Sequence, residues 1–141
     1  MNVLVDTSIW SIALRWHKKK HSENDKSLVA ELIELINESR ANIIGPIRQE
    51  LLSGIANETQ FTQLKKDLDS FIDISITAAD YENAAKLFNT ARKKGVQGSH
   101  IDFLICAIAI QHGMPIFTAD KDFLHYSKYI NIQLYIPRTT K

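Results

Sequence analysis

The segment Asn2-Val3-Leu4-Val5-Asp6-Thr7-Ser8 near the start of the chain decides the fold. Its first four residues form a short, apolar, β-branched run that is typical of a buried strand. The following Asp-Thr-Ser sequence ends the strand and supplies the N-cap of a helix. The chain therefore begins with a strand-to-helix transition that places a carboxylate at the carboxyl end of the strand.

The rest of the chain alternates strand and helix patterns. Further strands are predicted at 42–44, 71–74 and 115–117, with an edge strand at 132–136. Helices are predicted at 9–15, from Ser27 onward, from Pro46 onward, at 58–70, 77–94 and 99–112, with a turn at 118–123. This order predicts an α/β protein, a three-layer α/β/α arrangement with a central parallel sheet of four to five strands and Rossmann-like topology. No repeat or linker interrupts residues 1–141, which we expect to form a single domain.

Composition sets broad limits on function. With 141 residues, 45% of them hydrophobic, the chain can bury a core of its own, and a net charge of +1 neither demands nor excludes a polyanionic partner. Cys106 is the only cysteine, so an intrachain disulfide is impossible, and its apolar surroundings predict a buried thiol. There is no signal peptide pattern or apolar run of roughly 20 residues, so we expect a cytoplasmic protein with no membrane partner.

Four acids occupy equivalent places in the predicted topology. Asp6 follows the first strand, Asp120 follows the strand at 115–117, and Glu50 lies in the first turns of the helix after the second strand. Asp102 lies in the first turn of the most apolar helix. Ligands of parallel sheets bind beyond the carboxyl ends of the strands, so we expect these acids to face one site.

Two of these acids also have a purely structural explanation at helix starts. Asp6 can cap the first helix, and Ser99-x-x-Asp102 fits a capping box. Against the second explanation, Asp102 precedes eight apolar residues, where a charge is costly unless it is neutralised.

The other two positions leave alternatives open. Glu50 shares a helix face with apolar residues, so it either pairs with a neighbour such as Arg48 or lies at the rim of a cleft. Asp120 and Asp122 can both be turn residues, and either can be the fourth ligand of a metal.

Bringing several carboxylates together favours a bound cation. Two like charges about 4 Å apart repel by roughly 4 kcal/mol at an effective dielectric constant near 20. A carboxylate-rich site without a cysteine pair or a His-x-x-x-His spacing suits Mg²⁺ or Mn²⁺ better than zinc. Such an ion can activate water and stabilise charge on a phosphoryl oxygen, which predicts hydrolysis of a phosphodiester.

At these residues the chain resembles the PIN-domain family, and most of all the VapC toxins of toxin–antitoxin pairs. The resemblance rests on four motifs in order along essentially the whole chain. They are the apolar-Asp-Thr-Ser start, a Glu in the helix after the second strand, an Asp that opens an apolar, Ala-rich helix, and Thr-x-Asp-x-Asp-Phe after a strand; here they occupy 3–8, 48–54, 102–107 and 118–123.

The resemblance implies a Mg²⁺- or Mn²⁺-dependent endoribonuclease that forms a homodimer and is inhibited by a small, VapB-like antitoxin. It implies an RNA substrate such as tRNA or another structured RNA. It also implies roles for particular residues. Asp6, Glu50, Asp102 and Asp120 become catalytic residues and metal ligands, Asp122 is a further candidate ligand, and Thr7, Ser8 and Thr118 support the carboxylates.

A basic stretch follows the first predicted helix. Arg15, Lys18, Lys19 and Lys20 can contact RNA phosphates while Trp16 stacks on a base. Equally, the stretch can be a solvated loop with Trp16 in the core or in a dimer interface.

Three other functions compete with a metal-dependent ribonuclease. A histidine-driven ribonuclease needs an acid–base pair, and the five histidines are scattered. A structure-specific DNA nuclease of the flap type usually carries extra acids and a helical arch, for which 141 residues leave little room. A receiver-like or RNA-binding module would hold Mg²⁺ without catalysis, but the receiver pattern does not account for Glu50 and Asp102.

Overall fold

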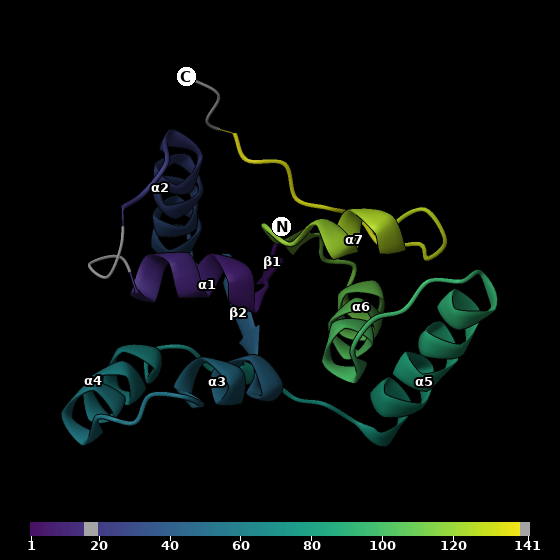
Figure 1. The fold of residues 1–141 in the computed structure, drawn as a ribbon, viewed down its shortest axis with the longest axis horizontal. Coiled ribbons are helices and arrows are strands. Elements are labelled where there is room, and N and C mark those ends of the chain that lie inside the picture. The colour runs from purple at the N-terminus through teal and green to yellow at the C-terminus, as the bar shows by residue number, and fades with distance from the viewer. Residues whose placement is uncertain (16–19, 139–141) are drawn as a thin grey trace.

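The computed structural model describes residues 1–15 and 20–138, and its helices surround one small parallel sheet (Figure 1). The strands are β1 (Val3–Val5), β2 (Ala41–Ile44), β3 (Asp73–Ile74) and β4 (Ile116–Phe117). The helices are α1 (Thr7–Leu14), α2 (Glu23–Asn37), α3 (Gly45–Leu52), α4 (Glu58–Leu68), α5 (Ala78–Lys93), α6 (His100–His112) and α7 (Lys121–Tyr126). All strand pairs are parallel, in the order β3-β2-β1-β4.

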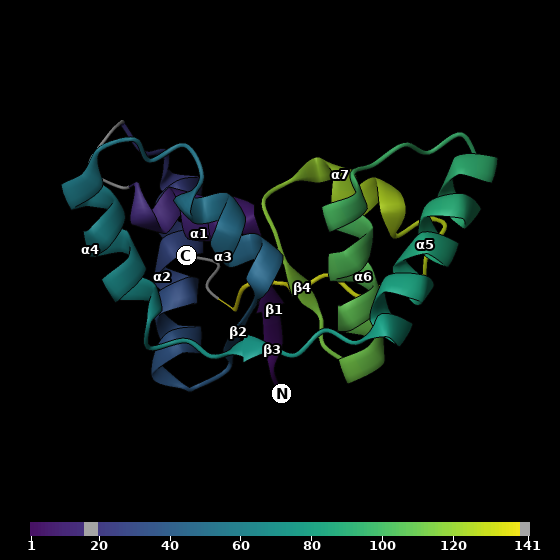
Figure 2. The ribbon, with the colours of Figure 1, turned by 90° about the horizontal axis from the view of Figure 1, so that it is seen from below.

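Helices cover both faces of this sheet. In Figure 2, helices α1 to α4 lie to the left of the strands, and helices α5 and α6 lie to their right. Right-handed crossovers require this arrangement, because the chain moves outward from β1 to β3 and then returns across β1 to β4. The predicted α/β/α fold class is therefore confirmed.

Strand β1 lies in the middle of the hydrophobic core. Its three residues are fully buried, as expected for a strand with helices on both faces. Cys106 lies in the buried central part of helix α6, 103–109, as predicted. The largest fully buried side chains are Trp10, Tyr126, Phe103, Phe117, Phe123, Leu4, Ile9, Leu32, Leu35, Ile43, Ile44 and Ile47.

Several helix boundaries follow from capping residues. Thr77 and Asp80 form a complete capping box at the start of α5, and Gly113 adopts a left-handed conformation (φ 64°) at the end of α6. The predicted start of the second long helix at Ser27 is wrong. The Ser22 side chain accepts from the amide of Asp25 at 3.0 Å, so α2 begins about one turn earlier, in a polar segment that gives no apolar periodicity.

The C-terminal part differs from the prediction in two places. The predicted turn at 118–123 ends in a short helix, α7, because Asp120 caps it through the amide of Asp122. The predicted edge strand at 132–136 reduces to one parallel bridge between Leu134 and Ile116. The amide of Tyr135 still donates to Ile116 O at 2.8 Å, and its ring lies 5.3 Å from that of Phe117, measured between centroids.

The C-terminal residues Tyr135 and Arg138 bind a buried carboxylate on α2. Glu31 is 1% exposed and accepts hydrogen bonds from the Tyr135 hydroxyl and from Arg138 Nε, the latter at 2.9 Å. Arg138 also pairs with Glu38 at 2.9 Å. Burial alone would raise the pKa of Glu31, but the bonds from Tyr135 and Arg138 outweigh it and hold the pKa below its ordinary value.

No helix within 1–15 and 20–138 combines the length and the apolar character that spanning a membrane requires.

Replacing Arg138 by Ala should lower the free energy of unfolding at neutral pH, because the buried Glu31 loses a charged donor. A carboxyl with a lowered folded-state pKa stabilises the fold above its ordinary pKa and loses that contribution as the pH falls through the lowered value. The deficit of the variant in urea unfolding should therefore shrink below about pH 4. Lys128→Ala, an exposed control, should cost nothing measurable; equal losses in both variants would contradict the role of Arg138.

Candidate active site

The candidate site lies at the carboxyl ends of β1 and β4, where the strand order changes direction. From β1 the chain builds the sheet toward β2 and β3, and then places β4 on the other side of β1. Loops that leave two such strands separate and form a crevice, which is the usual ligand site of open parallel sheets. Asp6 follows β1, and Thr118 follows β4.

Asp6 is a buried carboxylate held by hydroxyl groups from both loops. Its Oδ2 accepts from Ser8 Oγ at 2.8 Å and from Thr118 Oγ1 at 2.8 Å, and the side chain also caps α1 through the Ser8 amide. The same hydroxyl groups also accept hydrogen bonds from backbone amides. Ser8 Oγ accepts from the amide of Ala119 at 2.9 Å, and Thr118 Oγ1 accepts from the amide of Asp120 at 3.0 Å. Asp6 thereby ties the loop after β4 to the start of α1.

Glu50 approaches the same region from α3. Its Oε1 accepts from Thr7 Oγ1 at 2.8 Å, and its side chain is exposed. The alternative partner Arg48 binds elsewhere, to Asp73 at 2.8 Å. Glu50 therefore contacts the residue next to Asp6 rather than a cation of its own helix.

Asp102, at the start of α6, makes separate hydrogen bonds through its backbone amide and its side-chain carboxylate. Its amide donates to Ser99 Oγ at 3.0 Å, which is one half of the predicted capping box. Its carboxylate binds elsewhere, since Oδ2 accepts from the Tyr126 hydroxyl at 2.6 Å.

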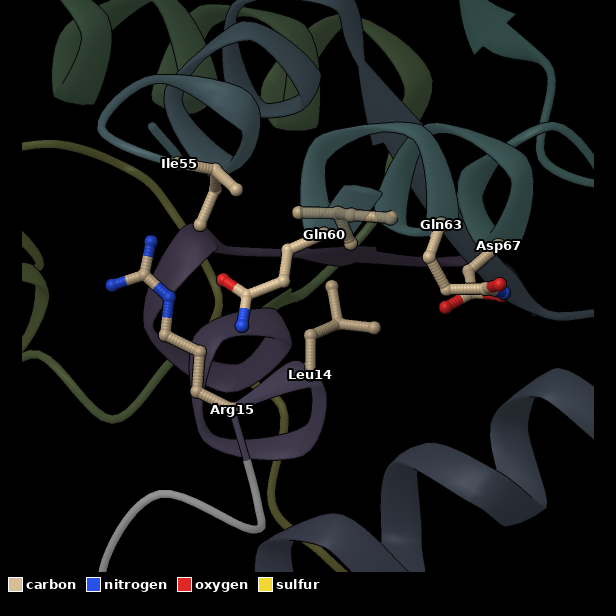
Figure 3. A pocket seen from close by; sticks show the side chains of 7 residues that line it. Leu14, Arg15, Ile55, Gln60, Gln63 and Asp67 are labelled. Carbon is tan, nitrogen blue, oxygen red and sulfur yellow. The ribbon is translucent and has the colours of Figure 1, made fainter. Parts of the chain in front are cut away.

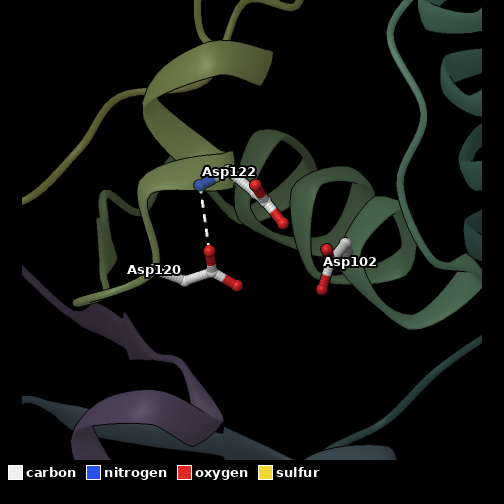
Figure 4. A group of neighbouring side chains, drawn as sticks. All are labelled: Asp102, Asp120 and Asp122. Carbon is white, nitrogen blue, oxygen red and sulfur yellow. Dashed lines mark hydrogen bonds between the residues drawn. The ribbon is translucent and has the colours of Figure 1, made fainter.

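Three carboxylates gather at this end of the sheet. Asp102, Asp120 and Asp122 each offer an oxygen within 4.8 Å of the others, and their side chains point toward one another from α6 and from the start of α7 (Figure 4). Asp120 also caps α7, so capping and membership of the cluster coexist. Asp6 is close enough for its charge to act on Asp102, whereas Glu50 stands apart, next to Thr7.

The two least exposed acids of the candidate site, Asp6 and Asp102, resist ionisation. Burial raises the pKa of Asp6 more than its hydrogen bonds from Ser8 and Thr118 lower it. Burial also raises the pKa of Asp102, and the negative charges of Asp6 and Asp120 add to this effect. Burial and the bond to Asp102 raise the pKa of Tyr126, so its hydroxyl remains a proton donor. Burial raises the pKa of the Cys106 thiol to about 12, which makes it unreactive.

This donor set fits a hard divalent cation. All candidate ligands are carboxylate oxygens, which Mg²⁺ and Mn²⁺ prefer. A cation would also remove the repulsion that raises the pKa of Asp102.

The predicted RNA-binding residues lie away from the cluster or outside the described chain. Arg15 follows the last residue of α1, roughly 12 Å from the start of that helix. It lines a mainly apolar groove between α1 and α4, beside Leu14, Ile55 and Gln60 (Figure 3). Lys20 is exposed, and Trp16, Lys18 and Lys19 lie outside the described residues.

The contact between Tyr126 and Asp102 is not predicted by the sequence. Tyr126 lies three residues after Phe123, so helical spacing could place it on the buried face of α7. Nothing in the sequence indicates that its hydroxyl reaches a carboxylate 24 residues earlier in the chain.

Comparison with known proteins bears on the whole chain. The family model for the PIN domain matches residues 3–129. Ribonuclease VapC11 of Mycobacterium tuberculosis is 30% identical over 135 residues, which cover 93% of this chain and 96% of that protein. These matches confirm the resemblance found in the motifs.

Solved structures share the fold. A structure of VapBC2 from Rickettsia felis, bound to a DNA fragment from its promoter, has a TM-score of 0.72 at 20% identity, covering 96% of this chain and 98% of that one. A toxin-antitoxin complex from Klebsiella pneumoniae has a TM-score of 0.59 at 18% identity, covering 86% of this chain and 90% of that one.

The raised pKa of Asp102 predicts a pH-dependent stability in EDTA. A carboxyl whose pKa is higher in the folded state stabilises the fold at low pH and loses that contribution as the pH rises through the raised value. Asp102→Asn keeps an acceptor for Tyr126 but removes the charge, so its Tm should exceed that of the wild type by about 2–5 °C near pH 7.5.

That advantage should be smaller at about pH 5, because a carboxyl with a raised pKa takes up its proton more readily as the pH falls. Calorimetry at both pH values measures it, with Asp69→Asn at the exposed end of α4 as control. A variant that melts below the wild type at both pH values would contradict this electrostatic account.

Proposed function

The chain belongs to the PIN domain family, and on that premise we propose that it is a Mg²⁺- or Mn²⁺-dependent endoribonuclease and the toxin of a toxin–antitoxin pair. Its similarity to VapC ribonucleases over nearly the whole length supports the reaction class. The site supports it through one observation above all, the three convergent carboxylates at the switch in strand order, with the buried Asp6 beside them.

In the proposed mechanism, Asp6, Asp102 and Asp120 would hold the ion, with Glu50 and Asp122 as further candidate ligands. A bound ion would make water a sufficient nucleophile near neutral pH and would offset negative charge on the phosphate. The chain's own residues prepare this site. The Asp6 carboxylate is held by the hydroxyl groups of Ser8 and Thr118, and the Asp102 carboxylate is held by the hydroxyl group of Tyr126.

Hydrogen bonds from hydroxyl groups fix the carboxylates before any ligand arrives. The hydroxyl groups of Ser8 and Thr118 accept hydrogen bonds from amides of the loop after β4, and both donate to the Asp6 carboxylate. These bonds hold the loop and the carboxylate in one relative position. Thr7 holds Glu50 in the same way. Such preorganisation lowers the cost of reorganising the site during the reaction.

The partners follow from the same proposal. We expect a structured RNA such as tRNA as substrate, contacted in part by Arg15, Lys18, Lys19 and Lys20. We also expect a VapB-like antitoxin and a homodimer of this single nuclease domain, residues 1–141. A toxin-antitoxin complex among the solved structures that share the fold supports the antitoxin.

Purified protein, free of any co-expressed partner, should cut total RNA and synthetic tRNAs into discrete fragments in Mn²⁺ or Mg²⁺ but not in EDTA. Asp6→Asn and Asp102→Asn should each lower the cleavage rate by at least about 100-fold, because each removes a charge that the ion requires. Electrophoresis of the products measures the rates, and circular dichroism checks the fold.

Asp69→Asn, at an exposed acid outside the site, should cleave at the wild-type rate. Cleavage by Asp6→Asn or Asp102→Asn at that rate would refute the site assignment. Intact RNA under all conditions would favour a Mg²⁺-binding or RNA-binding module without catalysis. Cleavage of branched DNA alone would favour a structure-specific DNA nuclease.

A further inference from the structure

Tyr126 packs against two aromatic rings beside the acidic cluster. Its side chain is 1% exposed, in α7. Its ring lies 4.9 Å from that of Phe103 on α6 and 5.3 Å from that of Phe123, measured between centroids. The ring therefore packs in the core, and its hydroxyl emerges at the start of α6.

That hydroxyl meets a carboxylate of the proposed metal site. It donates to Asp102 Oδ2 at 2.6 Å, a short bond of the kind that charged acceptors form. Phe at this position would fill the same space in the core, so packing alone does not require the oxygen.

The loop before α6 is built around this hydroxyl. A Cβ placed on Gly98 would lie 2.3 Å from the Tyr126 hydroxyl oxygen and 2.9 Å from the Phe103 ring. The neighbouring Ser99 caps the amide of Asp102. Gly98 thus leaves room for the phenol, and the same loop fixes the backbone of the residue whose side chain the phenol binds.

We propose that Tyr126 is a positioning residue, which holds the Asp102 carboxylate in the orientation that binds the divalent cation. The inference rests on the proposed function of the acidic cluster. Asp102 is tethered at both its amide and its carboxylate, whereas Asp122 sits in the exposed first turn of α7.

Two effects of the hydroxyl on metal binding oppose each other. By donating to Oδ2 it draws negative charge from the carboxylate, which weakens attraction to a cation. By fixing the side chain it removes rotamers that would point the carboxylate away from Asp120 and Asp122. Orientation dominates in this account, because partners that orient a metal ligand typically change affinity or activity by about 10- to 100-fold.

The direct test is Tyr126→Phe, which deletes only the hydroxyl. Titration with Mn²⁺, followed by the electron paramagnetic resonance signal of the free ion, should show a Kd raised about tenfold. At a fixed Mn²⁺ concentration below saturation, kcat for RNA should fall while KM for RNA stays unchanged, because the substrate does not touch Tyr126.

Tyr135→Phe is the matched control. It also removes a hydroxyl that donates to a carboxylate, but that carboxylate belongs to the buried Glu31 on α2, which is not a member of the acidic cluster. It should lower the Tm and leave the Mn²⁺ Kd at the wild-type value. Equal Kd values in Tyr126→Phe and the wild type, or tighter binding in the variant, would overturn the proposal.

Gly98→Ala gives a second, independent variant. Its methyl group should push the phenol away from Asp102 and weaken Mn²⁺ binding in the wild-type background. Added to Tyr126→Phe, it should weaken binding much less, because the bond to Asp102 is already lost. Fully additive losses would mean that Gly98 and Tyr126 act separately and would contradict the mechanism.

The Mn²⁺ titration also separates this inference from the proposed function. Tight Mn²⁺ binding by the wild type that weakens in Tyr126→Phe supports the inference even if no RNA is cleaved. Absence of Mn²⁺ binding by the wild type would refute it, whatever the protein does to RNA.

Discussion

Ser8 and Thr118 both donate to the same oxygen of Asp6, and this pair of hydrogen bonds joins the two halves of the site. Ser8 belongs to the helix that follows the first strand, and Thr118 belongs to the loop that follows the last. The strand order places these segments side by side across the switch in the sheet, although they are 110 residues apart in the chain. Because the loop after β4 also carries Asp120, the position of Asp6 sets where the acidic cluster can form.

Burial of Asp6 and partial burial of Asp102 make their ionised forms costly. Burial raises the pKa of Asp6, and burial together with the negative charges of Asp6 and Asp120 raises the pKa of Asp102. Glu31, a buried glutamate outside the site, has a lowered pKa because Tyr135 and Arg138 donate hydrogen bonds to it and Arg138 is positively charged. Within the described chain, the side-chain donors of Asp6 and Asp102 are hydroxyl groups, whereas Glu31 also accepts from a guanidinium. A divalent cation is the partner that would complete them.

The sequence predicts the layers well, and it also predicts that Asp6, Asp102 and Asp120 lie at strand ends or helix starts, because both features depend on local patterns. A buried apolar run before Asp6 and the cap at Ser99 can be recognised without knowing any distant contact. The parts it predicts poorly depend on tertiary context or on polar segments. Helix α2 starts in a polar turn without periodicity, and the last predicted strand is reduced to one bridge beside β4, while the Tyr135 hydroxyl binds Glu31 of α2. The bond between Tyr126 and Asp102 requires the packing of α6 against α7, which no local pattern encodes.

The most direct test of a cation site at the switch in strand order is anomalous diffraction from crystals soaked in Mn²⁺. The account predicts a peak in contact with carboxylate oxygens of Asp102 and Asp120, with Asp6 contributing directly or through water, and loss of the peak in Asp102→Asn crystals. A difference map without a peak at this cluster, at Mn²⁺ concentrations that support RNA cleavage, would contradict it.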